Sequence, residues 1–180
     1  SFIRGQPAPA PAPEPKPEEP KPAPAPKTEP SSSGSLKQQW LDGHNKRRSD
    51  FYKLFPSSWN VKNVPLKWSS DVERSAKEYA NILIKQNGCK IAHKVNSNVY
   101  GGENLAANWG NNQERTPSQI LKAWYEDEIN LNKMQLVGQK YHASQVVWRS
   151  SKYLGCAHAA KPYKDGTCFI QVCRYIQGGN

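Results

Sequence analysis

The distribution of proline limits what this chain can fold into. Of its 15 prolines, 11 fall at or before Pro30, alternating with Ala, Glu and Lys. Because proline fixes φ and lacks a backbone N–H, residues 6–30 favour an extended polyproline II conformation over a packed core. A Ser/Gly run at 31–35 predicts a flexible joint. We therefore expect a spacer over 1–35, which holds a folded domain over 36–180 away from a surface; the alternative is a ligand for a proline-binding module.

The net charge of +10 belongs to the predicted domain. The first 35 residues contain four basic and four acidic side chains, which cancel. A nucleic-acid role would require aromatic residues interleaved with Lys and Arg on an exposed sheet, and we expect no nucleic-acid partner. We interpret the surplus as a solvated basic face, with anionic cell-surface or wall polymers as an alternative partner. No apolar run is long enough for a membrane-spanning helix.

Three segments carry helical patterns. Residues 36–54 place apolar and aromatic side chains near one face. A second helix is expected from a cap at Ser69 or Ser70 to a stop at Gly88, with a strong apolar stripe. The third begins at the capping box of residues 116–119, where proline occupies the first helical position.

The C-terminal part of the domain has strand patterns. We expect strands at 144–149, 153–160 and 168–175, the last two flanking a turn rich in Pro, Asp and Gly. Helices precede strands without βαβ alternation. The order predicts an α+β fold with helices stacked on an antiparallel sheet.

The four cysteines test this arrangement geometrically. Cys168 and Cys173 lie on one predicted strand, about 16 Å apart, which is too far for a disulfide. A turn centred at 164–165 puts Cys156 opposite Cys173, so we predict that bond and, by elimination, Cys89–Cys168. An even cysteine count without C-x-x-C spacing favours two disulfides formed in an oxidising compartment.

Two histidines and two glutamates are candidates for chemistry. They are His93, Glu103, Glu128 and His142. If they converge in a cleft, they could bind a divalent metal or perform acid–base catalysis. Their spacing alone is weak support, because no pair has the helical H-x₃-H geometry of a zinc site, and surface or capping roles are the alternative.

Ordered motifs along the domain resemble those of the CAP superfamily, which comprises cysteine-rich secretory proteins, antigen 5 and plant pathogenesis-related class 1 proteins. The motifs are HNKRR at 44–48, PLKW at 65–68, CKIAH at 89–93 with GENL at 102–105, HASQVVW at 142–148, GC at 155–156 and CRY at 173–175. The resemblance implies an αβα sandwich in a secreted, extracellular protein. We expect Asn45 and Arg48 to hydrogen-bond neighbouring backbone, and Val146 and Trp148 to lie in the core.

The resemblance also implies a central cleft with a tetrad of two histidines and two glutamates. Carried over, the tetrad is His93, Glu103, Glu128 and His142, holding Zn or Mg that folding does not require. The third member has alternatives in Glu126 and Asp127. Glu128 is preferred because the Glu-Ile pair matches the family and because it lies four residues after a buried-stripe tryptophan on the expected helix.

Family members bind sterols or other small lipids, so the resemblance implies a secreted lipid-binding or lipid-exporting protein in defence or host–pathogen interaction. The segment 130–140 lacks the aromatic residues of sterol-binding relatives. It still offers four apolar side chains for contact with a sterol or fatty acid: Leu131, Met134, Leu136 and Val137.

Two other functions stay open at this point. The first is an effector or defence protein that binds a cell-surface or host protein. The second is a metal-assisted hydrolase, or a protease that uses Ser144 beside His142. A protease is disfavoured because no Asp is evidently placed to orient the imidazole, and we expect the protein not to be an enzyme.

Overall fold

The computed structural model describes residues 34–93, 101–110, 112–138 and 141–179. All of them belong to one unit of the chain, Ser32–Asn180. The predicted spacer lies almost wholly outside the described residues, so its boundary with the domain stays a prediction. Within the described ranges, no helix has the length and apolar character needed to cross a membrane.

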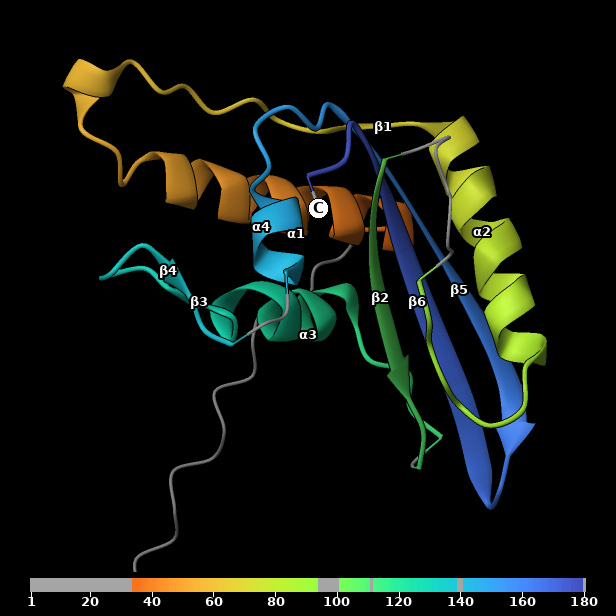
Figure 1. Cartoon of the computed structure of the whole chain (residues 1–180). Coiled ribbons are helices and arrows are strands. Elements are labelled where there is room, and N and C mark those ends of the chain that lie inside the picture. The colour runs from red at the N-terminus through yellow and green to blue at the C-terminus, as the bar shows by residue number, and fades with distance from the viewer. Residues whose placement is uncertain (1–33, 94–100, 111, 139–140, 180) are drawn as a thin grey trace, which may run out of the picture. The chain divides into compact units, whose positions relative to one another are not determined.

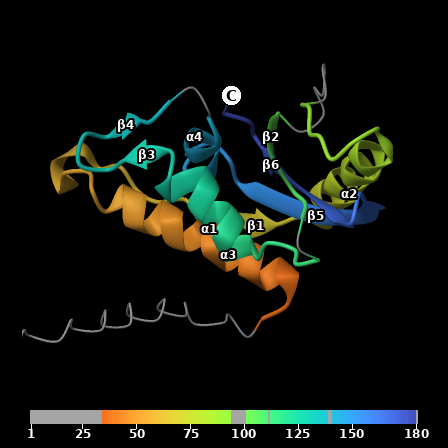
Figure 2. The same cartoon turned by 90° about the horizontal axis from the view of Figure 1, so that it is seen from below.

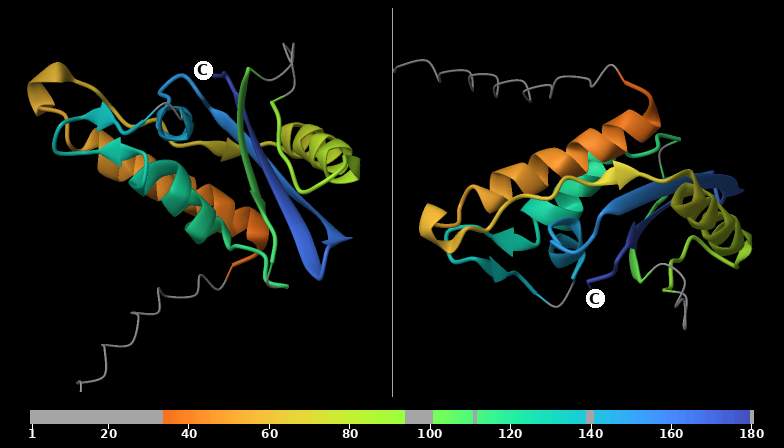
Figure 3. Two further views of the ribbon diagram at one scale, coloured as in Figure 1. Left: turned by 60° about the horizontal axis from the view of Figure 1, so that its bottom comes forward. Right: turned by 90° about the horizontal axis from the view of Figure 1, so that it is seen from above.

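A four-stranded sheet lies between two helical layers (Figure 1). Its strands, in spatial order, are β1 (Lys67–Trp68), β5 (Tyr153–Tyr163), β6 (Gly166–Ile176) and β2 (Gly102–Asn108). The views from below and from above show α2 on one side of the sheet and the other helices on the opposite side (Figures 2 and 3). These helices are α1 (Leu36–Tyr52), α2 (Ser70–Lys85), α3 (Pro117–Leu121) and α4 (His142–Val146). The predicted α+β fold and αβα sandwich are confirmed.

Smaller elements complete the domain. A 3₁₀ turn, η1 (Ser57–Trp59), follows α1, and a π-helical turn, η2 (Lys122–Glu126), continues α3. A short hairpin then forms from β3 (Ile129–Asn130) and β4 (Gln135–Leu136). The main sheet is antiparallel except at β1, which runs parallel to β5. The predicted antiparallel arrangement holds for β2, β5 and β6, and the two-residue β1 joins this sheet as a parallel edge strand.

Local sequence signals predict the starts of α2 and α3 correctly. The side chain of Ser69 accepts from the Val72 amide and caps α2, as expected. Thr116 and Gln119 form the reciprocal capping box at the start of α3. The α2 helix ends at Lys85, shortly before the predicted stop at Gly88, which has a positive φ of 81°.

The β5–β6 hairpin fixes the disulfide pattern. Its register pairs Cys156 with Cys173 directly across the two strands, and these residues are bonded. The second disulfide joins Cys89, in the loop after α2, to Cys168 on β6. Both predicted disulfides are confirmed.

The predicted strand at 144–149 is wrong, because this segment forms α4 and the turn after it. Ala143 and Val146 are buried three residues apart, which is a helical spacing. Val146 and Val147, the β-branched pair that favours a strand locally, lie at the C-terminal end of this helix. Val146 lies in the core as expected, but Trp148 is 40% exposed, so its expected core position is also wrong.

Both faces of the sheet are covered by core side chains. Along β6, Ile170 and Val172 face the cluster that includes Leu83 of α2, while Cys173 and Tyr175 belong to the cluster on the other face. Alternate residues of a strand point to opposite faces. Core side chains therefore pack on both faces of β6, the strand that pairs with β2 and Glu103.

Candidate functional site

The predicted tetrad forms two histidine–glutamate pairs. His93, in the loop after α2, places Nδ1 3.1 Å from Oε1 of Glu103 on β2. His142, the first residue of α4, places Nδ1 2.7 Å from Oε1 of Glu128. The His93 side chain is two-thirds exposed, whereas both glutamates are almost fully buried. The four side chains come from four separate segments of the chain.

Glu128 is positioned by a backbone irregularity and not by a helix face. The α3 helix gives way to the π-helical turn η2, which ends before Glu128, so the expectation that Glu128 lies on the helix is wrong. Its Oε2 accepts hydrogen bonds from the backbone amides of His142 and Ala143 at 3.1 and 3.3 Å. Glu128 therefore caps the N-terminus of α4, which has no side-chain cap of its own next to it.

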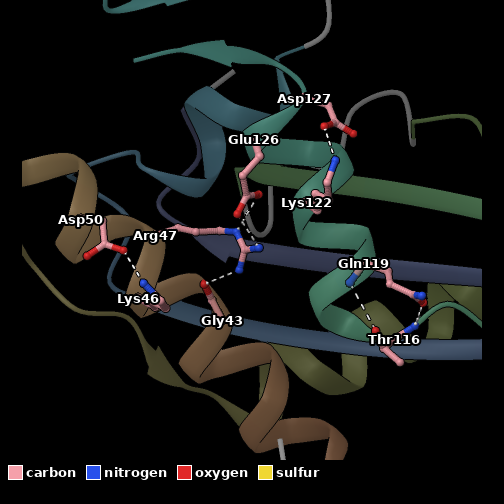
Figure 4. A network of polar contacts seen from close by, with 9 residues as sticks. All are labelled: Gly43, Lys46, Arg47, Asp50, Thr116, Gln119, Lys122, Glu126 and Asp127. Carbon is pink, nitrogen blue, oxygen red and sulfur yellow. Dashed lines mark hydrogen bonds and ion pairs between the residues drawn. The ribbon is translucent and has the colours of Figure 1, made fainter. Parts of the chain in front are cut away.

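The two alternatives for the third tetrad position are engaged elsewhere. Glu126 forms an ion pair with Arg47 of α1 at 2.7 Å, and Asp127 forms one with Lys122 at 2.6 Å (Figure 4). Of the three acidic side chains at 126–128, Glu128 is the one that lines the cavity beside His93 and His142. The preference for Glu128 thus agrees with the geometry, although its helical rationale does not.

Glu103 is held by a residue that the sequence analysis did not single out. Arg174 donates a hydrogen bond from Nε to Glu103 Oε2 at 2.9 Å, and its Nη2 forms an ion pair with the same oxygen, also at 2.9 Å. The guanidinium stacks over the Tyr79 ring, 4.8 Å from its centroid, and also donates to Ser75. Residues 103 and 174 lie opposite each other in the β2–β6 register. A cross-strand charge pair would have indicated Arg174, had that register been known.

A cavity of about 420 Å³ lies beside the two pairs. His93, Glu128 and His142 line it, while Glu103 sits behind His93 and does not. Its other walls are mostly apolar and come from the loop after α2, from β2 and from the α3–η2 segment. The His142 ring stacks on Trp124, with centroids 5.7 Å apart. The cleft therefore combines an apolar wall with polar groups in fixed orientations.

The residues fit part of a metal site. Each histidine directs Nδ1 to a carboxylate, which is the usual support for a metal-ligating imidazole, and Nε2 is the atom left to ligate. Within the described ranges, neither Nε2 of His93 nor Nε2 of His142 has a hydrogen-bonding partner. In the same ranges, however, no three His, Cys, Asp or Glu side chains are grouped closely enough to hold an ion. The two imidazoles could hold a divalent metal, with Glu103 and Glu128 orienting them.

The first motif is structural, as expected. Asn45 exchanges two hydrogen bonds with the backbone of Leu66. His44 is fully buried, accepts from the Tyr175 hydroxyl at Nε2 and donates from Nδ1 to the Trp40 carbonyl. Burial lowers the pKa of His44 from its ordinary value of 6.5 to about 3. This histidine is therefore neutral at physiological pH and lies in the core, away from the cleft.

A third histidine–carboxylate pair lies outside the cleft. His158 Nδ1 is 2.5 Å from Oε1 of Glu114, and the indole of Trp40 donates to His158 Nε2 at 2.7 Å. Burial alone would raise the pKa of Glu114, but the hydrogen bonds from His158 and Gln171 lower it below its ordinary value. Because both ring nitrogens of His158 are engaged, this pair links α1 to the sheet and has no free ligating atom.

The predicted lipid-contact residues lie on the β3–β4 hairpin. Leu131, Met134, Leu136 and Val137 are all exposed, by 37 to 55%. A separate apolar pocket of about 340 Å³ opens between the C-terminal end of α1 and α4, lined by Phe51, Val147 and Trp148 among others. The sequence analysis missed this pocket because its walls come from segments almost a hundred residues apart. Trp148, which lines this pocket, is 40% exposed.

Comparison with known proteins identifies the family. The model of the cysteine-rich secretory protein family, CAP, matches residues 41–175. The chain belongs to the CAP family. Among relatives of this CAP domain, pathogenesis-related protein 1C of Nicotiana tabacum is 30% identical over 151 residues, covering 80% of this chain and 76% of the tobacco protein. A probable pathogenesis-related protein of Candida albicans is 30% identical over 152 residues, covering 84% of this chain.

The relatives extend beyond the shared domain to different degrees. This chain spans 40% of the Candida protein and 57% of cysteine-rich secretory protein 2 of Homo sapiens, which is 28% identical. Among solved structures, venom allergen-like protein 4 of Schistosoma mansoni matches with a TM-score of 0.57 and 22% identity, covering 82% of this chain and 91% of that one. A hookworm platelet inhibitor matches with a TM-score of 0.55 and 16% identity, covering 81% and 70%. These structures support the CAP fold.

Proposed function

We propose that this CAP protein is secreted and binds small lipids, such as sterols or fatty acids, outside the cell. The observation that carries the proposal is the β3–β4 hairpin, where four large apolar side chains are exposed within seven residues: Leu131, Met134, Leu136 and Val137. Contiguous exposed apolar surface usually marks a place that a ligand, membrane or partner covers. The two disulfides agree with an extracellular location.

The apolar pocket between α1 and α4 supports the same function. Its volume of about 340 Å³ lies within the range of small-molecule sites. Phe51, Val147 and Trp148 supply apolar wall that suits an alkyl chain or part of a ring system, and Ser144, Arg149 and Ser150 add polar groups. A neutral or weakly polar lipid would gain free energy by leaving water for such a pocket.

A divalent metal in the cleft is the second part of the proposal. The imidazoles of His93 and His142 would hold Zn²⁺ or Mg²⁺ through Nε2, and a bound metal would act there as a Lewis acid. Zinc is the better match for imidazole ligands. NaASP2, whose structure was solved with Zn²⁺, shares the fold at a TM-score of 0.52, with 20% identity over 83% of this chain. Folding does not depend on the metal in this proposal, because disulfides and core already hold the four segments.

Direct binding of a fluorescent sterol and a fluorescent fatty acid to the purified full chain tests the lipid proposal. We expect saturable binding to one of them, weakened about tenfold or more when Met134→Asp and Leu136→Asp are combined, since each charge opposes burial against an apolar ligand. Ile82→Asp is the matched control, because Ile82 is as exposed but lies on α2. Binding of neither lipid would refute the proposed function.

Calorimetric titration with Zn²⁺ and Mg²⁺ tests the metal separately. We expect Zn²⁺ binding that the combined His93→Ala and His142→Ala variant abolishes, while the unfolding midpoint in the presence of a chelator stays unchanged. His158→Ala serves as the comparison, because both ring nitrogens of His158 are already engaged. Equal zinc affinity in the wild type and the double variant would remove the cleft as the metal site.

A further inference from the structure

Six large apolar side chains are exposed at one end of the domain. Leu54 (50% exposed) and Trp59 (63%) follow α1, and the other four lie on the β3–β4 hairpin. Figure 1 and the left view of Figure 3 show η1 and this hairpin projecting at the same end of the sandwich, beyond the C-terminal end of α1. We call these six residues the distal apolar surface: Leu54, Trp59, Leu131, Met134, Leu136 and Val137.

Trp59 is the most exposed of these side chains and is held in place. It closes the 3₁₀ turn Ser57–Trp59, and its amide donates to the Pro56 carbonyl at 3.0 Å. Its ring packs on Phe55, with centroids 5.9 Å apart, and Phe55 in turn packs on the end of α1. An ordered indole that projects into solvent from a loop suits the boundary between water and lipid, where tryptophan is enriched.

The charge around the distal apolar surface is positive. Residues 53–66 and 129–138 contain Lys53, Lys62 and Lys133 but no Asp or Glu. Of these lysines, Lys62 and Lys133 have no ion-pair partner within the described ranges, and Lys53 approaches only Asp50, at 3.7 Å. Two loops that are apolar at their surface and basic at their rim complement an anionic lipid headgroup layer.

The acidic side chains nearest in sequence to these loops all have partners, and Glu128, directly before the hairpin, is buried and hydrogen-bonded to His142. Asp50 pairs with Lys46 at 2.6 Å, and Glu126 and Asp127 form the ion pairs with α1 and η2 described above (Figure 4). An approaching anionic bilayer therefore meets unpaired lysines and not unpaired carboxylates. A protein partner with an acidic rim would also complement these lysines. A bilayer is favoured because the apolar side chains are divided between two projecting loops, which a protein partner does not require.

We propose that the distal apolar surface docks onto an anionic lipid bilayer. The six side chains enter the headgroup region, and Lys62 and Lys133 contact anionic headgroups from the rim. Docking of this kind is peripheral and needs no membrane-spanning helix. It places the hairpin that we proposed as the lipid contact at the membrane, so that lipid is exchanged there; only this exchange step rests on the proposed function.

Co-sedimentation of the full chain with vesicles tests the docking. We expect binding to vesicles of phosphatidylcholine and phosphatidylserine in equal parts, and much weaker binding to phosphatidylcholine alone. Trp59→Ser should reduce the partition coefficient about tenfold, since moving one large apolar side chain out of water contributes affinity of that order. Ile82→Ser, at an exposed position on α2, should leave it unchanged. Lys62→Glu combined with Lys133→Glu should remove the preference for phosphatidylserine.

Two outcomes would overturn the docking. One is equal vesicle binding by the wild type and Trp59→Ser. The other is concentration-dependent dimerisation, seen by sedimentation equilibrium and lost in Trp59→Ser, without vesicle binding; it would assign the surface to a second copy of the chain.

Docking and lipid capture can fail separately. Trp59→Ser should still bind a dispersed fluorescent fatty acid or sterol with wild-type affinity, because Trp59 lies outside the hairpin. Vesicle binding without any binding of dispersed lipid would support the docking while refuting the proposed function. Binding of dispersed lipid without vesicle binding would do the reverse.

Discussion

Arg48 is a fully buried charged residue whose guanidinium is satisfied by backbone carbonyls. It donates to the carbonyls of Val64, Val146, Trp148 and Ser151, at 2.7 to 3.3 Å. Burial lowers the pKa of the Arg48 guanidinium below its ordinary value. One side chain thus ties α1 to the segment before β1 and to the end of α4. The sequence motif correctly indicated a structural role, but it could not indicate which carbonyls would be bound.

His44, one turn earlier, makes stability depend on pH. Its pKa is about 3 in the folded protein and 6.5 ordinarily, so the unfolded chain binds a proton that the folded protein does not. The free energy of unfolding should therefore fall as pH drops below 6.5, by about 1.4 kcal/mol per pH unit until pH approaches 3. Urea unfolding at several pH values measures the slope, and His44→Gln should flatten it. His93→Gln, at an exposed histidine, is the control. If the pH slope of the unfolding free energy were unchanged in His44→Gln but flattened in His93→Gln, its assignment to His44 would be contradicted.

At the scale of elements, α4 shows how a short helix depends on a distant residue. Its five residues are too few to be stable as an isolated helix. Glu128 satisfies two of its N-terminal amides from 14 and 15 residues away. The β-branched sequence of the segment favours a strand locally, and the prediction of a strand at 144–149 followed that preference. Packing of Ala143 and Val146 against the core, together with this cap, overrides it.

Glu128→Ala should destabilise the protein by about 2 kcal/mol, because it leaves buried amides of α4 without an acceptor. Urea unfolding in the presence of a chelator measures this loss apart from any metal. Glu126→Ala is the matched control: it removes an ion pair whose glutamate is 44% exposed and should cost less than about 1 kcal/mol. Equal losses of unfolding free energy in the two variants would show that capping by Glu128 does not stabilise the protein measurably.

At the scale of the whole molecule, the two disulfides constrain the chain unequally. Cys89–Cys168 joins residues 79 apart and connects the loop after α2 to the sheet. Cys156–Cys173 joins residues 17 apart that the hairpin already holds together. A longer closed loop removes more entropy from the unfolded chain. The longer-range bond also fixes the base of the segment that carries His93.

Removing Cys89–Cys168 should therefore cost more stability than removing Cys156–Cys173. Loop-closure entropy predicts about 4.5 kcal/mol for the first and about 3 kcal/mol for the second. Differential scanning calorimetry of the Cys89→Ala/Cys168→Ala and Cys156→Ala/Cys173→Ala variants compares them directly. A larger loss for the hairpin disulfide would mean that strain or packing, and not loop length, decides the order.

The sequence by itself determined the features that depend on neighbouring residues. Capping signals located the starts of α2 and α3, and turn chemistry set the β5–β6 register and hence both disulfides. Motif order was enough to indicate the CAP family and to nominate the four tetrad residues, although not their pairing. Each of these signals acts over a few residues, or through a register that one turn fixes.

The tertiary structure alone decided the features that depend on distant contacts. Arg174 holds Glu103 from 71 residues away, and the π-helical turn η2 delivers Glu128 to α4 in place of the expected helix face. Likewise, only folding brings Trp59 to the same end of the domain as the β3–β4 hairpin. Such contacts depend on where the sheet and helices place chain segments, and local propensity carries no information about that placement.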